Sequence, residues 1–197
     1  MKHALPLLLL LFVACNREPG LTPRDVLTRD QIDGFNQPVL LAEIEALETA
    51  ATLIHHSVNG SVVTWTTGDQ VTLSFQDELL IATRGLGDDL MSADVANSIQ
   101  MLRGKIESGH YPRFHSYLDG EYQTQYRSFQ CKRGTAISET VTIFSRNHAT
   151  TRIEEHCVSP GLEITNIYWR GTDGFLWKTR QWVSPTVGYV ATEQLAR

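Results

Sequence analysis

Aromatic and cationic side chains gather in one stretch near the end of the chain, residues 162–190. The stretch reads LEITNIYWRGTDGFLWKTRQWVSPTVGYV, and Asp173-Gly174 separates two runs of strand-forming residues. Both turn residues tolerate the positive φ angles of a type I′ turn, so we predict a β-hairpin. Aromatic rings can pack on the apolar C–H faces of sugars, while cationic groups can reach sugar hydroxyls. The candidate glycan-binding or partner-binding residues of this hairpin are Tyr168, Trp169, Arg170, Trp177, Lys178, Arg180 and Trp182.

The position of the turn predicts which residues of the hairpin lie opposite each other. Arg170 is expected opposite Trp177 on one face, and Trp169 opposite Lys178 on the other, where directly opposed side chains touch. If the sheet has one solvated face, one of these pairs faces outward. The other interpretation is that the aromatic rings fill the core of a barrel and that arginine stems cover them.

The sequence lacks the motifs of the common enzyme and metal-site classes. It contains no G-x-S-x-G elbow, no P-loop and no H-E-x-x-H. His55 and His56 are adjacent, so on a strand their side chains point to opposite faces. Asp88 and Asp89 are more typical of a polar turn than of an acid–base pair. We therefore predict no catalytic residue, no metal site and no cofactor.

Three cysteines are present, and two of them are expected to form a disulfide. If Cys15 carries a lipid, two cysteines remain, Cys131 and Cys157. An even number of remaining cysteines in an exported chain indicates one disulfide. Such a bridge would stabilise the fold by about 3 kcal/mol in the chain-entropy model. Two free thiols, or a catalytic cysteine, are the alternatives.

The beginning of the chain carries a targeting signal. A short basic start precedes an apolar run over residues 4–13, which is too short to span a membrane. The run ends in Phe12-Val13-Ala14-Cys15, which resembles a lipobox and implies cleavage before Cys15 and lipid attachment to its thiol. Asn16 at the next position favours the outer membrane. The alternative is an ordinary secretory signal in which Cys15 is incidental.

The remaining sequence predicts one β-rich domain behind a tether. We expect a signal peptide over residues 1–14, a tether over 15–37 and a single domain over 38–197. Within the tether, a short helix is expected from Thr22 through Leu27, and residues 28–32 could extend it. The net charge of −5 argues against nucleic acid as a partner. Residues 38–54 read either as a helix or as two strands that turn near Leu47 and Glu48.

Short strands and turn signals alternate through most of this domain. Asn59-Gly60 is a hairpin signal that would pair His55 with Thr64. Another turn is expected at Asp119-Gly120. A helix is expected over 94–108, with Gly109 as its stop. The expected strands are residues 50–58, 62–66, 71–75, 79–84, 122–129, 137–145 and 150–157, with turns at Gly68-Asp69, Gln76-Asp77, Arg146-Asn147 and Ser159-Pro160-Gly161.

Several of these segments resemble one known family. Trp65 with Gly68-Asp69, then LLIATRGLGDDL at residues 79–90 and QWVSPTVGYV at 181–190, are similar to the YjbF/GfcB family. Its members are lipoproteins associated with group 4 capsule and exopolysaccharide secretion. The resemblance covers about residues 38–190 and implies a mostly antiparallel, curved, partly open β-barrel. It therefore favours two strands over a helix for residues 38–54. It carries over no catalytic residue.

Together these observations predict a mainly β protein: an antiparallel meander forming a curved, partly open barrel or sandwich, with one or two short helices. We expect an outer-membrane lipoprotein, anchored by lipid on the periplasmic face, that assists the assembly or export of capsule or exopolysaccharide. Its partners would be polysaccharide secretion proteins, polysaccharide, or both, since it could bind the glycan or act as a scaffold, for example by pairing an edge strand. A periplasmic glycan-processing enzyme is the alternative.

Overall fold

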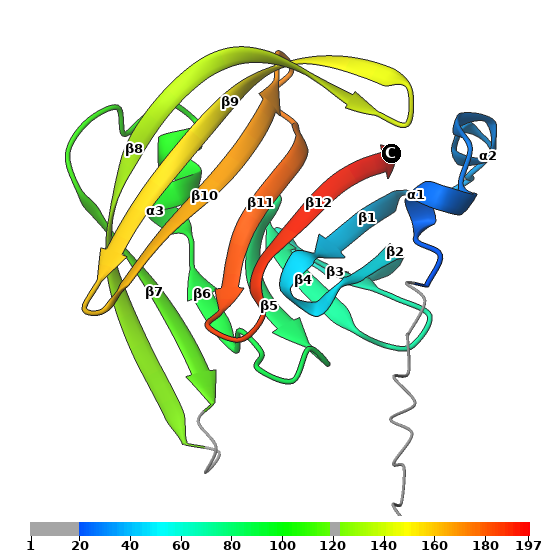
Figure 1. Cartoon of the computed structure of the whole chain (residues 1–197). Helices are drawn as coiled ribbons and strands as arrows, with labels where there is room; N and C mark the ends of the chain where they lie inside the picture. The colour runs from blue at the N-terminus through cyan, green and yellow to red at the C-terminus, as the bar shows by residue number, and fades with distance from the viewer. Residues whose placement is uncertain (1–19, 119–122) are drawn as a thin grey trace, which may run out of the picture.

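The computed structural model describes residues 20–118 and 123–197, and its strands form one antiparallel sheet. The twelve strands follow the order β5-β4-β3-β2-β1-β12-β11-β10-β9-β8-β7-β6 (Figure 1). The two ends of the sheet, β5 and β6, are consecutive in the chain and lie against each other. Thr83 N in β5 donates to Leu90 O at 2.9 Å, just before β6 begins. The sheet is therefore a barrel that is nearly closed, which confirms the predicted mainly β fold.

The strands of the described residues are β1 (Val39–Ile44), β2 (Thr49–Asn59), β3 (Val62–Thr66), β4 (Thr72–Gln76), β5 (Leu79–Arg84), β6 (Ser92–Asp94), β7 (Tyr111–Leu118), β8 (Thr124–Ile143), β9 (Arg146–Ser159), β10 (Leu162–Gly171), β11 (Leu176–Ser184) and β12 (Gly188–Ala196). The helices are α1 (Pro23–Val26), α2 (Arg29–Asp33), α3 (Ala96–Leu102) and the 3-10 turn η1 (Glu45–Leu47).

The ambiguous segment 38–54 forms two strands, β1 and β2, as the family resemblance implied. They join through η1, and Glu48 takes a left-handed φ of 47° in the turn. The sequence of β1 lacks strand-like alternation because both of its faces are buried. Leu40 packs into the barrel, whereas Leu41 packs on the outside against Ile32 and Ile143. A strand buried on both sides reads as a continuous apolar run.

The outer cover of β1 comes mainly from the long hairpin of β8 and β9. Its free end arches over the outside of the sheet (Figure 1), where Ile143 is fully buried. The sequence predicted two separate strands where β8 is one strand of 20 residues, interrupted by a bulge between Arg133 and Ala136. The turn uses Phe144 and Ser145, both with positive φ, and so precedes the predicted position.

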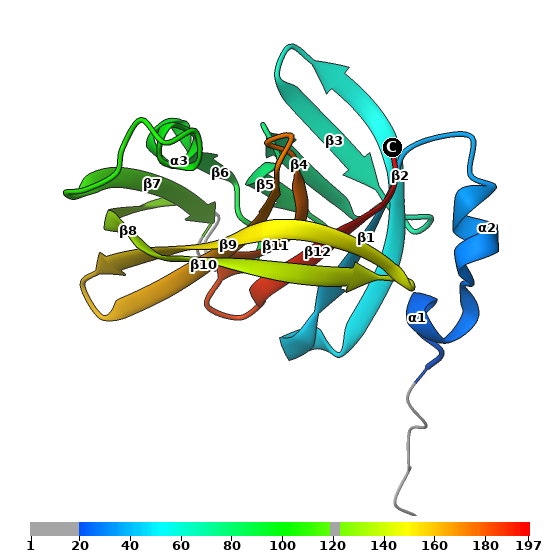
Figure 2. The same cartoon turned by 90° about the horizontal axis from the view of Figure 1, so that it is seen from above.

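The predicted helix over residues 94–108 exists but is shorter. It spans only Ala96–Leu102, because Gly104 adopts a φ of 73° that ends the helix. Asp94 belongs to β6, and its carboxylate accepts a hydrogen bond from Ala96 N at 3.0 Å. Ile99 and Met101 insert into a core cluster with Phe129, so α3 fills the side of the barrel farthest from the N-terminal helices (Figure 2).

The first strong turn signal is displaced by one residue. Gly60, with φ of 59°, and Ser61 form the turn, so that Asn59 lies opposite Val62. A register shift near His56 then places His55 opposite Trp65, where the sequence predicted Thr64. The predicted turn at Asp119-Gly120 lies outside the described residues.

Two short helices occupy the described part of the segment predicted to be a tether. They pack outside the barrel, beside β1 and β2 (Figure 1), and Ile32 in α2 is fully buried. Arg24 in α1 forms ion pairs with Glu43 at 2.6 Å and Glu193 at 2.9 Å. This part of the segment is therefore folded onto the domain. The division into signal peptide, tether and domain stays a prediction.

The predicted cysteine pair is joined in the structure. Cys131 and Cys157 lie directly opposite each other on β8 and β9, and their sulfur atoms form a disulfide with Cα atoms 4.0 Å apart. Cys15, the predicted lipid site, lies outside the described residues. Among the described residues, no helix has the length and apolar character needed to cross a membrane.

Candidate functional site

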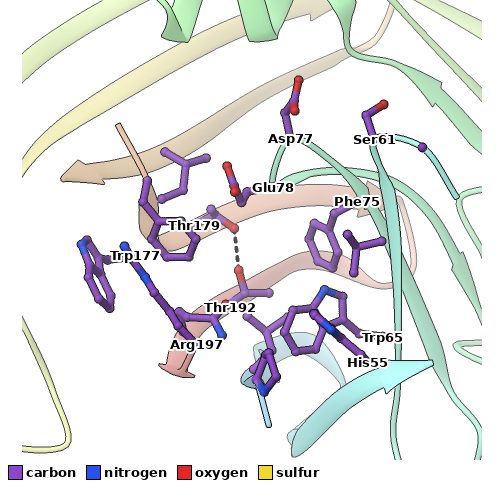
Figure 3. A pocket seen from close by; sticks show the side chains of 17 residues that line it. His55, Ser61, Trp65, Phe75, Asp77, Glu78, Trp177, Thr179, Thr192 and Arg197 are labelled. Carbon is purple, nitrogen blue, oxygen red and sulfur yellow. Dashed lines mark hydrogen bonds between the residues drawn. The ribbon is translucent and has the colours of Figure 1, made fainter. Parts of the chain in front are cut away.

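A cavity of about 440 Å³ opens at the end of the barrel where β12 finishes (Figure 3). Segments that are far apart in the sequence contribute to it: the start of β1, the β2–β3 hairpin, the β4–β5 turn, the β10–β11 loop and β12. Its lining combines aromatic, hydroxyl and carboxylate groups. The residues that line it are Pro38, Leu40, His55, Gly60, Ser61, Val63, Trp65, Phe75, Asp77, Glu78, Phe175, Leu176, Trp177, Thr179, Thr192, Gln194 and Arg197.

One wall of the cavity consists of inward-facing residues of β3 and β4. Val63 lies opposite Phe75 in the ladder, and Trp65 follows two residues after Val63, so alternation places all three on the inner face. The ring of His55 in β2 packs edge-on against Trp65, with centroids 4.1 Å apart. Trp65 is nearly buried, whereas His55 is exposed at the mouth. This wall therefore offers a ring edge and an apolar surface to a ligand.

The opposite wall is built around Arg197. Its guanidinium carbon lies 3.7 Å from the ring centre of Phe175 and 4.1 Å from that of Trp177. Its two terminal nitrogens donate to the Asp173 carboxylate at 3.1 Å. Trp177 also stacks on His148, with centroids 3.7 Å apart, so its ring mainly supports the wall. Phe175 and Trp177 are both half-buried, and Phe175 is the ring of this wall that does not stack on His148.

Hydroxyl groups lie between the two walls. Thr179 on β11 and Thr192 on β12 are directly opposed, and their hydroxyl oxygens are 2.7 Å apart (Figure 3). Gln181 donates to the Thr179 hydroxyl at 3.0 Å, which fixes its orientation. An apolar cavity that ends in paired hydroxyls suits an amphipathic ligand better than a purely apolar one.

Two adjacent carboxylates stand at the rim, in the turn between β4 and β5. Asp77 and Glu78 both have positive φ, 47° and 62°, so the turn that the sequence placed at Gln76-Asp77 lies one residue later. Arg103 donates to Asp77 at 3.0 Å. The Glu78 carboxylate forms no hydrogen bond or ion pair within residues 20–118 and 123–197. Partial desolvation of its carboxyl by the surrounding residues, and then the neighbouring charge of Asp77, raise the pKa of Glu78 above its usual value, against the opposing effect of Arg197 and Arg103.

The seven residues predicted to bind a glycan or partner do not form one surface. Only Trp177 lines the cavity. Tyr168 and Trp182 point into the core, and Trp169 packs on the outer side beneath the β8–β9 hairpin. Their separation follows from the strand geometry, because successive side chains alternate between the two faces of a sheet. A binding role for these residues stays a prediction. Arg180 stacks on Tyr189 at 3.6 Å and lines a separate groove near Glu43.

The predicted hairpin at Asp173-Gly174 forms, but its register is only partly as expected. Trp169 lies opposite Lys178, and the Lys178 ammonium is 5.4 Å from the Trp169 ring centre, as the sequence predicted. Arg170 lies opposite Leu176 and not Trp177, because a bulge interrupts the ladder. The turn is also longer than two residues, since Gly171 N bonds to Phe175 O.

A second polar cluster lies inside the barrel, away from the cavity. Its centre is the ion pair of Arg113 and Glu155 at 3.0 Å, in which both side chains are almost fully buried. Burial opposes the ionisation of Glu155, but Arg113 and the surrounding hydrogen bonds outweigh it and hold the pKa of this carboxyl below its usual value. Glu155 also lies near Cys131 and Cys157, but those sulfur atoms are bonded to each other.

Most of the cavity residues carry no functional signal in the sequence. Trp65 belonged to a recognised motif, and the alternation of residues 71–75 placed Phe75 on one face of a strand. No local signal could show that Arg197 returns to Phe175, since Arg197 follows β12 and Phe175 precedes β11. The signal that could have been used is the turn at Asp77-Glu78, which places two carboxylates just after Gln76, the residue that follows the inward-facing Phe75.

Comparisons with known proteins give a consistent result. A family model described as "Group 4 capsule polysaccharide lipoprotein gfcB, YjbF" matches residues 10–195. The crystal structure of the hypothetical lipoprotein YmcC from Escherichia coli (K12) aligns with a TM-score of 0.76 at 16% identity, over 88% of this chain and 91% of that chain. This likeness shows a shared fold.

A putative exported protein with a YmcC-like fold from Bacteroides fragilis NCTC 9343 aligns with a TM-score of 0.34 at 10% identity, over 81% and 93% of the two chains. No curated protein matches this sequence.

Proposed function

This chain belongs to the family of group 4 capsule polysaccharide lipoproteins, and we propose that it binds the polysaccharide in the barrel cavity during assembly or export. In this proposal the protein is not an enzyme and is anchored through Cys15 on the periplasmic face of the outer membrane. The observation that supports the proposal most is the lining of the cavity, which joins aromatic walls to hydroxyl and carboxylate groups.

A glycan matches this lining because a sugar ring is itself amphipathic. Its C–H groups can pack against Phe175 and the His55–Trp65 pair, and its hydroxyls can bond with the Thr179 and Thr192 hydroxyls. The volume of about 440 Å³ lies within the usual range of small-molecule sites. A short segment of a polymer is therefore the ligand that we propose.

The position of the start of α1, beside Glu43 and Glu45, supports a cavity that faces away from the anchor. Arg24 in α1 pairs with Glu43 near the end of β1, whereas the cavity includes Pro38 just before β1 starts. A strand of six residues spans about 20 Å, so the two features lie at opposite ends of the barrel. The step from Cys15 to Gly20 can extend at most about 18 Å. A lipid on Cys15 would then hold the domain close to the membrane, with the cavity directed into the periplasm.

Two other functions make different predictions. A scaffold that pairs an edge strand needs a free edge. The sheet ends β5 and β6 lie against each other, but β8 residues 132–143 pair with β9 alone among the described strands and offer such an edge. A glycan-processing enzyme finds support in the raised pKa of Glu78 beside Asp77. Incubation of the protein with the polysaccharide, followed by measurement of new reducing ends, tests that alternative.

The proposed function is tested by binding of detergent-solubilised mature lipoprotein to polysaccharide isolated from its source strain. His55→Ala and Phe175→Ala should each weaken binding about tenfold, because each removes a ring from the cavity wall. Tyr126→Ala is the matched control, since Tyr126 is 83% exposed and lies on β8 outside this cavity. Melting temperatures confirm that each variant is folded. Equal binding by all four proteins would contradict the proposal.

A further inference from the structure

The cationic groups near the cavity are already paired. Arg197 is held by the Asp173 carboxylate, and its guanidinium group lies over the rings of Phe175 and Trp177. Arg103 is paired with Asp77 at 3.0 Å. Within the described residues that line the cavity, no Lys or Arg side chain is therefore available to pair with a carboxylate on a ligand. His55 is the other titratable nitrogen-bearing group at the mouth.

In contrast to these arginines, the Glu78 carboxylate at the same mouth has no hydrogen-bonding or ionic partner among the described residues. The Glu78 carboxylate projects at the cavity rim (Figure 3), and no residue of the described chain donates a hydrogen bond to it. Its position is restricted, because Glu78 sits in a tight turn with φ of 62° and is followed directly by the buried Leu79. A carboxylate without donors at the edge of an apolar cavity is suited to accept hydrogen bonds from ligand hydroxyls.

We infer that the cavity selects an uncharged stretch of glycan over one that carries uronic acids, and that the Glu78 carboxylate sets this preference. The inference rests on the proposed glycan-binding function. A neutral sugar offers hydroxyl donors to Glu78 and C–H faces to the walls. A uronate at the same position brings a second negative charge, with no free arginine or lysine to neutralise it. Like charges within about 5 Å, in the reduced dielectric of a protein surface, weaken binding at least tenfold.

The test compares two forms of one polymer. The polysaccharide from the source strain is oxidised at its primary alcohols to uronates, and half of the product is then reduced back to alcohols. The two probes thus share chain length and linkages and differ in charge. The mature wild-type protein should bind the reduced probe at least tenfold more tightly at pH 7.5. Glu78→Gln should narrow this difference to about threefold or less, since the amide still bonds to hydroxyls but carries no charge.

Glu48→Gln is the matched control, because Glu48 is also an exposed glutamate in a turn with positive φ but lies at the other end of the barrel. This variant should keep the full wild-type preference. If the wild type binds the oxidised probe equally or more tightly, or if Glu78→Gln leaves the preference unchanged, the inference is overturned and glycan binding stands. If the wild type binds neither probe nor the untreated polysaccharide, the proposed function and the inference both fail.

Discussion

The substitution Glu155→Gln is expected to destabilise the barrel strongly without touching the cavity. The Glu155 carboxylate is fully buried and accepts hydrogen bonds from five side chains on α3, β7 and β10. Its donors are Ser98, Tyr111, Arg113, Asn166 and Tyr168. Glutamine has almost the same shape, so the change removes mainly the negative charge and reverses the hydrogen-bonding role of one terminal atom.

The expected loss of stability follows from Arg113, the partner that remains after the carboxylate is removed. Arg113 is 1% exposed and has no other carboxylate as a partner among the described residues, so its charge would remain buried and uncompensated. Removal of one member of a buried ion pair typically costs about 3–5 kcal/mol. The double variant Arg113→Met/Glu155→Gln buries no charge, and should therefore be at least about 2 kcal/mol more stable than the sum of the two single effects predicts.

Urea unfolding followed by tryptophan fluorescence measures both quantities. Asp33→Asn is the matched control, because the ion pairs of Asp33 with Arg29 and Arg146 are partly exposed and should contribute less than about 1 kcal/mol. A cost below 1 kcal/mol for Glu155→Gln, with additive single effects, would refute the reasoning that loss of the carboxylate leaves Arg113 as an uncompensated buried charge.

Three further predictions concern stability and anchoring. Reduction of the disulfide, or Cys131→Ser, should lower the stability by about 3 kcal/mol for a separation of 26 residues; equal urea midpoints with and without reductant would contradict this. Burial, and then the charge of Arg113, hold the pKa of His115 well below its usual value, so only the unfolded chain gains this proton as the pH falls below 6.5. The free energy of unfolding should therefore decrease by about 2 kcal/mol between pH 6.5 and 5, and His115→Gln should remove this decrease. An unchanged pH profile in the variant would exclude His115 as the source of the decrease. Cys15→Ala should abolish labelling with radioactive fatty acid, and retention of the label would place the lipid elsewhere.

The fold was predictable from the sequence to the extent that local signals determine strands and turns. The Asp173-Gly174 turn and the segment from Leu79 to Arg84 were found because turn chemistry and alternation act over a few residues. The helix-like composition of residues 38–54 left a helix and two strands open, since burial of both faces of β1 removes the alternation. The Asn59-Gly60 hairpin signal favoured a strand over residues 50–58, and the family resemblance decided the whole segment for strands.

The register of the hairpins was less predictable, because bulges change it without a clear local signal. The bulge beside Trp177 places Arg170 opposite Leu176, and the register shift near His56 places His55 opposite Trp65. The cavity depends on such registers, since one residue of displacement turns a side chain to the other face. The hairpin sequence contains seven aromatic and cationic candidates but does not indicate which of them point inward.

The Glu155 cluster was missed for a different reason. Its members come from α3, β7, β9 and β10, and each looks like an ordinary polar residue in its own segment. The alternation of β9 even places Glu155 at an inward position, where an apolar residue is normally expected. An isolated charged residue on the buried face of a strand is the local signal that predicts a buried partner.

The central claim is that the cavity must be open for polysaccharide export, and a blocking substitution tests it most directly. Ser61→Trp adds a large ring at the exposed rim, whereas Gly68→Trp adds the same ring at the next turn, where a side chain meets open space. Both variants would be expressed in a source strain that lacks the wild-type gene, and surface polysaccharide would be measured at equal lipoprotein levels. The account predicts at least a fivefold loss for Ser61→Trp and none for Gly68→Trp. Full secretion by Ser61→Trp would contradict it.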